Sequence, residues 1–369
     1  MRFQTTRSEL LDLILFSSKA INQKTSTFIL NGVLLETDKK LNVFSTNLET
    51  SIKSILDVKV EEKGKVVVPA KILINILKSL KESKIDIELN KKTNQIQIIS
   101  DNAHFNLNTL LLEEYPAFPE TKKQNPIKIK FDEFTNLISK VQRAASQDEN
   151  RAILTGILME IKNKELTLVA TDSYRLAKIN KELKTEGKEI KIIVPSKVLE
   201  SIIKNDFKKT ELEIVLEEKQ IVFYLIKEGK VKNIIISRLL SGKFPEYKKL
   251  LPVEMKHNII IEKEKILDVV RRISSISQDN IPIKLIIDKG KITAIMDIKE
   301  IGSSSEDFEI AYGEEKMEMA FNPYYLIDGI NMMDGKNIIL SIEEPLKPML
   351  IKSEKNNNMV YLLMPIRVS

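Results

Sequence analysis

The sequence predicts an α+β protein in which one domain is repeated three times, each copy packing two helices on antiparallel sheets. The first observation is a segment that recurs as VVVPAKIL, IIVPSKVL and MAFNPYYL, at residues 66–73, 192–199 and 319–326. Pro69, Pro195 and Asn322 hold the same place in these segments, at intervals of 126 and 127 residues. That period is too long for a solenoid unit and suits a whole domain.

Further matched segments keep the same spacing and the same order. Gly32 and Gly156 lie 124 residues apart in FILNGVLLE and AILTGILME, and Phe118 and Phe244 lie 126 apart in YPAFPE and SGKFPE. The segments LNVFSTNLE and LTLVATDSY form another pair. Chance rarely produces so many coincidences in one order, so we infer a true repeat whose third copy is the most diverged.

Each repeat is predicted to run from a helix through hairpin strands and a second helix into further strands. Leu10, Leu13 and Ile14 follow the i, i+3, i+4 spacing of one buried helix face, and alternating segments indicate strands. The elements expected in the first repeat are helices at 8–20 and 70–81 and strands at 28–36, 41–55, 84–90, 95–100 and 104–112, with a turn at 38–40. The later helices are expected at 131–145, 196–205, 262–275 and 322–333.

Two polar, proline-containing links separate the repeats, at 121–126 and 252–258. They divide the chain into predicted domains at residues 1–125, 126–253 and 254–369. Helices grouped on antiparallel sheets make an α+β architecture.

The composition lacks the usual equipment of catalysis. The sequence has no cysteine, which excludes disulfides and thiolate chemistry, and its two histidines, His104 and His257, are 153 positions apart. No glycine-rich phosphate loop occurs. We therefore expect no metal site and no cofactor.

The sequence also gives no sign of a membrane protein. No run approaches the roughly 18 apolar residues of a membrane span. The N-terminus, MRFQTTRSEL, has no signal-peptide core. We expect a cytoplasmic protein with no membrane partner.

The net charge of +6 is concentrated on and next to the predicted helices, since the windows 7–20, 70–84, 131–144, 196–209, 262–273 and 322–336 together hold 17 Lys and Arg against 12 Asp and Glu. Two interpretations are open. Bases near helix C-termini and acids near N-termini complement the helix dipole. Alternatively, the bases form a weak phosphate-binding surface without sequence preference.

Three motifs carry a resemblance to a known family. They are LVATDSYRLA (168–177), SRLLSGKFPEYKKLLP (237–252) and the terminal YLLMPIRVS (361–369). Together they resemble the bacterial DNA polymerase III β subunit, the replicative sliding clamp, and the likeness covers the whole chain in order. It implies the ring-forming DNA clamp fold, in which a head-to-tail homodimer with twelve helices around its hole encircles duplex DNA. Such a protein is a processivity factor without catalytic residues.

The resemblance also implies partners. They are double-stranded DNA, the DNA polymerase III α subunit, the clamp loader, and other polymerases and repair proteins that bring short linear motifs, with a nucleoid location during replication. The implied peptide pocket consists of Leu154, Thr171, Tyr174, Arg175, Leu176, Pro245, Lys249, Leu250, Tyr325, Leu346, Pro348, Leu362, Met364, Pro365, Ile366 and Arg367. Arg175 and Arg367 are expected to hydrogen-bond the peptide.

Two further sets of residues are expected to make contacts. The bases expected to meet DNA phosphates are Arg7, Lys24, Lys71, Lys78, Lys140, Arg143, Arg151, Lys197, Lys204, Arg271 and Arg272. The residues expected at the dimer interface are Phe105, Leu107, Ile273, Ile276, Glu300 and Glu306. Tyr324 stands where the first two repeats have Lys71 and Lys197, which suggests that the third copy has changed from DNA contact toward partner contact.

Two rival functions remain. A clamp-like paralogue that closes no stable ring is possible, since Ser274 and Ser275 stand where the family has an apolar pair at the interface. A hydrolase would use Asp172, Tyr174 and Arg175, but the sequence offers no nucleophile–histidine pair and no metal cluster.

Overall fold

The computed structural model describes residues 1–21, 27–183, 189–204, 207, 210–252, 254–277, 281–356 and 358–367. The chain divides into two compact units, one of Met1–Phe134 and Lys204–Leu239 and the other of Thr135–Ile203 and Leu240–Ser369. Each unit joins an outer repeat to part of the middle repeat, so the predicted domain boundaries stay a prediction. Among the described residues, no helix is long and apolar enough to cross a membrane.

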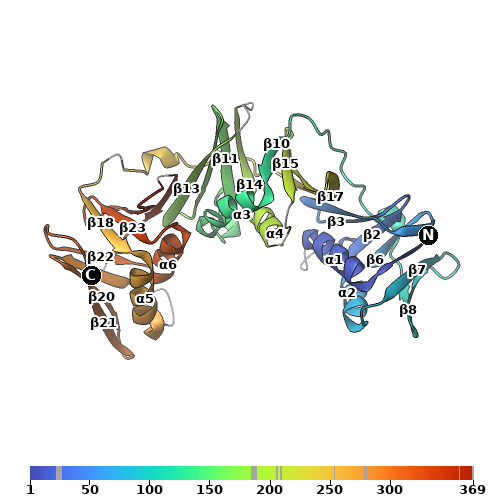
Figure 1. Cartoon of the computed structure of the whole chain (residues 1–369), viewed down its shortest axis with the longest axis horizontal. Helices are drawn as coiled ribbons and strands as arrows, with labels where there is room; N and C mark the ends of the chain where they lie inside the picture. The colour runs from blue at the N-terminus through green and yellow to red at the C-terminus, as the bar shows by residue number, and fades with distance from the viewer. Residues whose placement is uncertain are drawn as a thin grey trace. The chain divides into compact units, whose positions relative to one another are not determined.

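The first repeat has two α-helices that lie side by side against its strands (Figure 1). Leu10 and Ile14 of the first helix and Leu73 and Leu77 of the second are buried in one apolar core. The elements are β1 (Arg2–Thr6), α1 (Arg7–Ser17), β2 (Gly32–Thr37), β3 (Leu41–Thr46), β4 (Thr50–Leu56), β5 (Lys59–Glu62), β6 (Gly64–Pro69), α2 (Ala70–Ser79), β7 (Lys84–Asn90), β8 (Gln95–Ser100) and β9 (Ala103–Asn108).

The second repeat follows the same order of elements. They are β10 (Ile127–Lys130), α3 (Phe131–Ser139), β11 (Gly156–Lys162), β12 (Glu165–Thr171), β13 (Arg175–Glu182), β14 (Ile190–Pro195), α4 (Ser196–Ile203), β15 (Glu211–Leu216), β16 (Gln220–Lys227) and β17 (Lys230–Arg238). The short 3₁₀ turns Gln142–Ala144 and Glu149–Thr155 follow α3.

The third repeat completes the pattern. Its elements are β18 (His257–Glu262), α5 (Lys263–Ile273), β19 (Ile283–Asp288), β20 (Lys291–Ile298), β21 (Gly302–Glu309), β22 (Met317–Phe321), α6 (Pro323–Met332), β23 (Asn337–Ile342), β24 (Met349–Ser353) and β25 (Met359–Leu363). Asn322 caps α6 by accepting hydrogen bonds from the N–H groups of Tyr324 and Tyr325. The predicted α+β class, with two helices on antiparallel strands in each repeat, is confirmed.

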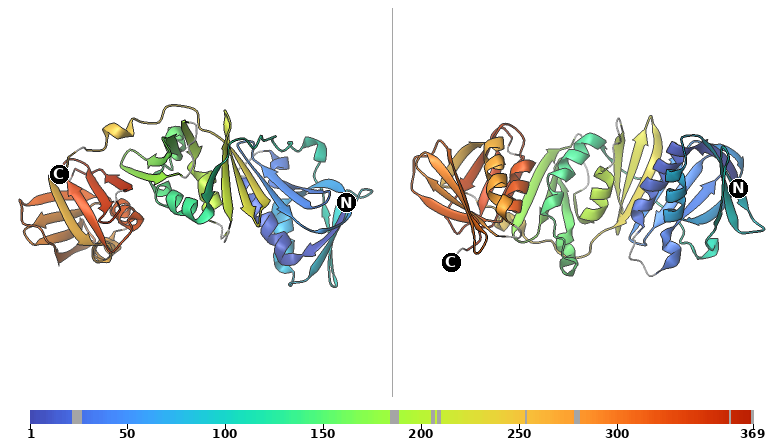
Figure 2. Two further views of the ribbon diagram at one scale, coloured as in Figure 1. Left: turned by 45° about the horizontal axis from the view of Figure 1, so that its top comes forward. Right: turned by 90° about the horizontal axis from the view of Figure 1, so that it is seen from below.

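Two eight-stranded antiparallel sheets each join two repeats (Figures 1 and 2). Their orders are β10-β15-β16-β17-β4-β3-β2-β6 and β14-β11-β12-β13-β25-β24-β23-β18. We call the pairing of β17 with β4 the first junction and the pairing of β13 with β25 the second junction. Ile235 lies opposite Ile52 at the first, and Tyr361 lies opposite Ala177 at the second.

The two remaining sheets end in strands that correspond to the junction strands. Their orders are β5-β1-β7-β8-β9 and β21-β20-β19-β22. In the first repeat β9 holds the place that β17 and β25 hold in the other two. In the third repeat β21 holds the place of β4 and β13. Both β9 and β21 are edge strands of their sheets.

Some predicted elements differ from the structure. The predicted strand 41–55 is two strands, because the Asn47 side chain accepts hydrogen bonds from the N–H groups of Glu49 (3.0 Å) and Thr50 (2.7 Å). The predicted strand 28–36 begins as a 3₁₀ turn, and β2 starts at Gly32, where a Cβ would lie 2.7 Å from Val67 Cγ1.

The predicted ends of several elements also change. The helices predicted at 8–20, 131–145 and 262–275 end earlier and are followed by short 3₁₀ turns. The strand predicted at 104–112 is β9, which ends at Asn108. The described part of the helix predicted at 196–205 ends at Ile203, and residue 205 lies outside the described residues.

Candidate functional site

A tight turn between β12 and β13 presents Tyr174 to solvent. Asp172 Oδ1 accepts hydrogen bonds from the N–H groups of Tyr174 (2.9 Å) and Arg175 (3.0 Å), and the Thr171 hydroxyl donates to the Arg175 carbonyl (2.7 Å). Ser173 takes a left-handed φ of 79°. The turn leaves the Tyr174 side chain 58% exposed at its tip.

The segment after β25 is anchored beside this turn. The Met364 N–H donates to the Tyr174 carbonyl (2.9 Å), and the Ile366 N–H donates to the Ala320 carbonyl (2.7 Å). Met364 is 39% exposed and Ile366 is 37% exposed. The segment therefore fixes the partly exposed Met364 beside Tyr174 and the partly exposed Ile366 beside β22.

The second and third repeats share an apolar floor here. Leu176, Leu362 and Leu350 lie opposite one another on β13, β25 and β24, and all three are buried. They belong to one cluster with Phe244 and Tyr247 of the segment that follows β17. A surface of this kind can accept apolar side chains from a ligand.

The remaining predicted pocket residues lie mostly at the surface. Leu346 is 67% exposed on the turn between β23 and β24, and Leu250 is 50% exposed directly after the 3₁₀ turn Tyr247–Lys249. Lys249 pairs with Glu246 (2.5 Å). Pro245 and Arg367 are exposed, and Leu154, Tyr325, Pro348 and Pro365 are half-buried.

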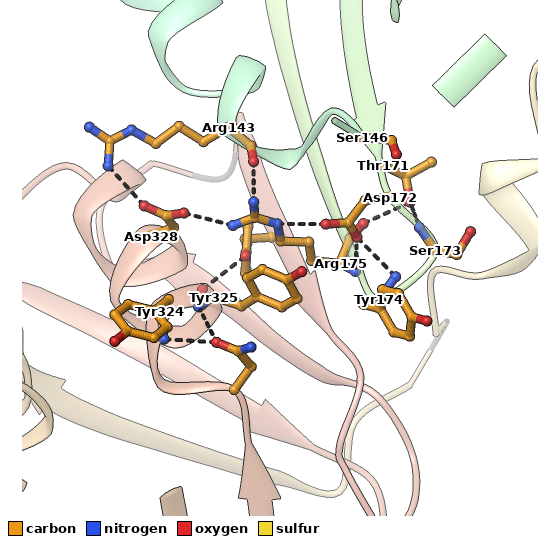
Figure 3. Close-up of polar contacts among 12 residues, drawn as sticks. Arg143, Ser146, Thr171, Asp172, Ser173, Tyr174, Arg175, Tyr324, Tyr325 and Asp328 are labelled. Carbon is orange, nitrogen blue, oxygen red and sulfur yellow. Dashed lines mark hydrogen bonds and ion pairs between the residues drawn. The ribbon is translucent and has the colours of Figure 1, made fainter. Parts of the chain in front are cut away.

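Arg175 is buried and hydrogen-bonds three groups inside the protein (Figure 3). Its Nε donates to Asp172 Oδ2 (3.0 Å), its Nη1 donates to Asp328 Oδ2 (2.7 Å), and its Nη2 donates to the Arg143 carbonyl. Its guanidinium carbon lies 4.1 Å from the centre of the Tyr325 ring. Three of its five N–H groups thus donate within the chain, and the expectation that Arg175 also hydrogen-bonds a bound peptide stays a prediction.

The neighbouring acidic and hydroxyl groups stabilise the charged form of Arg175. Burial lowers its pKa, but interactions with Tyr361, Asp328 and Asp172 outweigh burial, and the pKa lies above its ordinary value. Asp328 also accepts a hydrogen bond from Arg143 Nη1 at Oδ1 (2.8 Å). Two carboxylates and two guanidiniums thus form one network across the second junction, which we call the Arg175 network.

Sequence reasoning missed the acids of α6 and the loop that follows it. Asp328 pairs with Arg143 and Arg175, and Asp334 pairs with Lys140. Their basic partners lie 153 to 194 residues away in the chain. A sequence pattern over a few residues cannot indicate an ion pair between residues so far apart. An acid on α6 therefore resembles an ordinary surface residue in the sequence.

The two junctions carry one backbone arrangement and different side chains. The Arg238 N–H donates to the Glu49 carbonyl (2.9 Å) at the first junction, as the Met364 N–H does to the Tyr174 carbonyl at the second. Arg238 and Glu49 are exposed charged residues, whereas Met364 and Tyr174 are apolar and aromatic. At this pair of matched positions, exposed apolar side chains therefore occur at the second junction and charged side chains at the first.

Some bases predicted to bind DNA are exposed and others are committed elsewhere. Lys71, Lys78, Lys197, Lys204 and Arg271 are exposed on or next to helices, with Lys197 near Glu149 (2.8 Å) and Arg271 near Asp268 (3.8 Å). Lys24 lies outside the described residues.

The other predicted bases have partners that limit them. Lys140 is only 8% exposed and pairs with Asp334. Arg7 Nε donates to the Leu77 carbonyl at the end of α2 (2.8 Å), and Arg151 Nη1 donates to the Asp172 carbonyl (3.0 Å). Arg143 pairs with Asp328 and Arg272 with Glu306. Lys140 is thus committed inside the chain, whereas the side chains of Arg143 and Arg272 are 59% exposed, and DNA contact by these five bases stays a prediction.

The residues predicted at the dimer interface lie on or near β9 and β21. Phe105 is half-buried and Leu107 buried on β9. Ile273 is buried at the end of α5, where the Ser304 hydroxyl of β21 donates to its carbonyl (2.9 Å). Ile276 is half-buried, Glu300 is exposed, and Glu306 accepts from Arg272 Nε (2.9 Å).

The hydrolase interpretation has little support at this turn. Asp172 is held by two backbone N–H groups and by Arg175, which together use three of the roughly four acceptor positions of its carboxylate. Within the described residues, no group of three or more His, Cys, Asp or Glu side chains could hold a metal ion. The arrangement is suited to binding.

Comparison with known proteins assigns the chain to a family. Models of the N-terminal, central and C-terminal domains of the DNA polymerase III beta subunit match residues 1–119, 128–246 and 248–367. The beta sliding clamp of Bacillus subtilis is 29% identical and that of Chlamydia pneumoniae is 27% identical, each over 100% of this chain and at least 99% of the relative. A crystal structure of the Bacillus subtilis DNA polymerase sliding clamp has a TM-score of 0.93 at 28% identity, covering 100% of both chains. The chain belongs to the DNA polymerase III beta subunit family, the bacterial sliding clamps of DNA replication.

Proposed function

We propose that two copies of this chain pair head to tail into a closed ring that encircles duplex DNA and tethers a polymerase. The main support is that equivalent strands pair twice within the chain, β17 with β4 and β25 with β13. The remaining equivalents, β9 and β21, are edge strands of their sheets. A strand edge that repeats a paired strand is suited to pairing with another chain. A head-to-tail contact that repeats with rotation closes a ring.

The repeats also supply a register for the contact. The N–H groups of Leu110, Leu240 and Ile366 donate to the carbonyls of Val67, Ile193 and Ala320, which aligns β9 with β17 and β25. The left-handed residues Leu48, Ser173 and Glu300 align β4, β13 and β21. Transferred to a second copy, the register sets Phe105 opposite Ser304 and His104 opposite Ser305.

This register is testable because the chain has no native cysteine. His104→Cys combined with Ser305→Cys places two exposed positions directly opposite, within the reach of a disulfide. We expect mild oxidation to give a covalent product of twice the chain mass. The matched control, His104→Cys with Asp307→Cys, shifts the pair by two residues along the same face and should cross-link poorly. Equal yields would contradict the register, and a monomer by analytical ultracentrifugation at micromolar concentration would favour the non-closing paralogue.

DNA contact is proposed for the exposed bases Lys71, Lys78, Lys197, Lys204 and Arg271. Phosphate contacts position a protein without reading sequence, which suits sliding. The mechanism is topological, so the chain acts as a processivity factor and not as an enzyme. We place it in the cytoplasm, at the nucleoid during replication.

Protein partners are proposed for the surface formed by Tyr174, Leu250, Leu346, Met364 and Ile366, which we call the partner surface. The exposed apolar side chains over a buried leucine row support it, and a flexible methionine suits varied ligands. The proposed partners are short linear motifs of the DNA polymerase III α subunit, the clamp loader, and other polymerases and repair proteins.

A further inference from the structure

We propose that Asp328 is a positioning residue of the partner surface, which it holds in shape through Arg175. The inference rests on the proposed function of that surface. Asp328 is on α6 of the third repeat, and Arg175 begins β13 of the second. The ion pair between them (2.7 Å) ties the turn that carries Tyr174 to the helix that carries Tyr325.

The contacts of Arg175 hold three elements at once. Its guanidinium binds Asp172 within the turn, Asp328 on α6 and the carbonyl of Arg143 after α3. It also lies against the ring of Tyr325, and the main-chain carbonyl of Tyr325 accepts a hydrogen bond from the Tyr361 hydroxyl of β25 (2.9 Å). The guanidinium therefore contacts the turn and α6 directly and is linked to β25 through Tyr325.

The turn in turn positions the terminal segment. The Tyr174 carbonyl accepts a hydrogen bond from the Met364 N–H. A displacement of the turn therefore moves the exposed side chains of Tyr174 and Met364 together. Neither Asp328 nor Arg175 needs to touch a bound peptide for this effect. Their role is to fix the spacing between Tyr174, Met364 and the third repeat.

The charge balance explains why Asp328 is needed. Asp172 and Asp328 face Arg175 and Arg143, so the network is neutral. Asp328→Asn leaves the buried Arg175 with Asp172 alone and removes its ion pair to α6, whereas the Arg143 side chain is 59% exposed and stays solvated. Weakening the pairing of a buried charge is costly. We expect Arg175 to lose its fixed position and the turn to move.

The test measures the affinity of a fluorescently labelled peptide carrying the clamp-binding segment of the same organism's DNA polymerase III α subunit. Asp328→Asn should weaken binding about tenfold, because the partner surface loses its shape while its apolar side chains remain. The conservative variant Asp328→Glu keeps the charge and should restore most of the affinity.

A matched control is available in the same repeat. Asp334 also spans the second junction, through Lys140, but belongs to no part of the Arg175 network. Asp334→Asn should lower thermal stability to a similar degree and leave the peptide affinity within about twofold. Equal losses of affinity in Asp328→Asn and Asp334→Asn would overturn the proposal, since general loosening of the junction would explain both.

A double-mutant cycle separates positioning from general stability. If Asp328 acts through Arg175, Asp328→Asn should add little to the loss of affinity already caused by Arg175→Gln. Additive losses would contradict the proposal. A wild-type protein that does not bind the peptide would refute the proposed partner surface, whereas wild-type affinity in Asp328→Asn would refute only the positioning role.

Discussion

The first and second junctions pair their strands in the same antiparallel way, but the side chains beside their helices are aromatic at the first and charged at the second. At the first, Phe16 and Phe131 pack edge-to-face on Phe207, with ring centres 5.1 Å and 5.3 Å apart. At the second, the Arg175 network and the Lys140–Asp334 pair occupy the corresponding region.

The difference shows what each junction has to do. An aromatic contact tolerates small displacements, because its energy is mainly burial and dispersion. A buried ionic network is stable only when every partner is in place. We infer that the ionic network lies at the second junction because the partner surface there must keep a defined shape.

The largest expected effect comes from breaking the network. Arg175→Ala leaves Asp172 and Asp328 without their common cation, and removing one partner of a buried pair costs about 3–5 kcal/mol. Urea unfolding of the full chain measures this loss. A change in the free energy of unfolding below about 1 kcal/mol would contradict the role of the network.

A charge exchange tests the outer surfaces of the two junctions. Tyr174→Glu with Met364→Arg gives the second junction the residue types of the first, while the backbone hydrogen bond between these positions is kept. We expect peptide affinity to fall about a hundredfold because two exposed anchors are lost. The matched control, Glu49→Tyr with Arg238→Met, should leave affinity unchanged. Peptide binding that survives the first exchange would contradict the partner surface.

A smaller effect is expected from the aromatic contact of the first junction. Phe16→Leu keeps an apolar side chain but loses the edge-to-face contact with Phe207, which should cost about 1–2 kcal/mol. Thermal and urea unfolding measure this change. Peptide binding should be unaltered, and a loss of affinity would show that the junctions are not independent.

The smallest effect concerns an exposed carboxylate near the first junction, Asp57, which pairs with two lysines. Hydrogen bonds from Lys40 and Lys232 lower the pKa of Asp57 to about 2. Because the folded pKa is depressed, the stabilisation is present above the ordinary value of 3.8 and is lost as the pH falls toward 2. The difference in melting temperature between wild type and Asp57→Asn should therefore shrink between pH 4 and pH 2. A constant difference would contradict the assignment.

The repeat and the main elements were predictable because periodicity and spacing are local signals. Helix faces such as Leu10 and Ile14 and the matched Gly32 and Gly156 could be read directly. The division of β3 from β4 could have been predicted from Asn47, since its side chain caps the turn as Asp172 does in the next repeat.

The chemistry of the basic residues was not predictable. Lys140, Arg143 and Arg175 looked available for DNA or peptide, but Asp334 and Asp328, which pair with them, lie in another repeat. Only the fold brings such residues together. Tyr324 stands where the first two repeats have Lys71 and Lys197, and it is followed by Tyr325. This difference in the sequence was a useful signal, because Tyr325 lies against Arg175 at the second junction.

The central claim is that a closed ring holds DNA by topology, and retention on circular DNA tests it most directly. Assembled on nicked circular DNA by its clamp loader, the protein should remain bound at high salt and be released when the DNA is linearised, because weak phosphate contacts are screened while a closed ring is not. Release from the intact circle on raising salt alone would contradict the account.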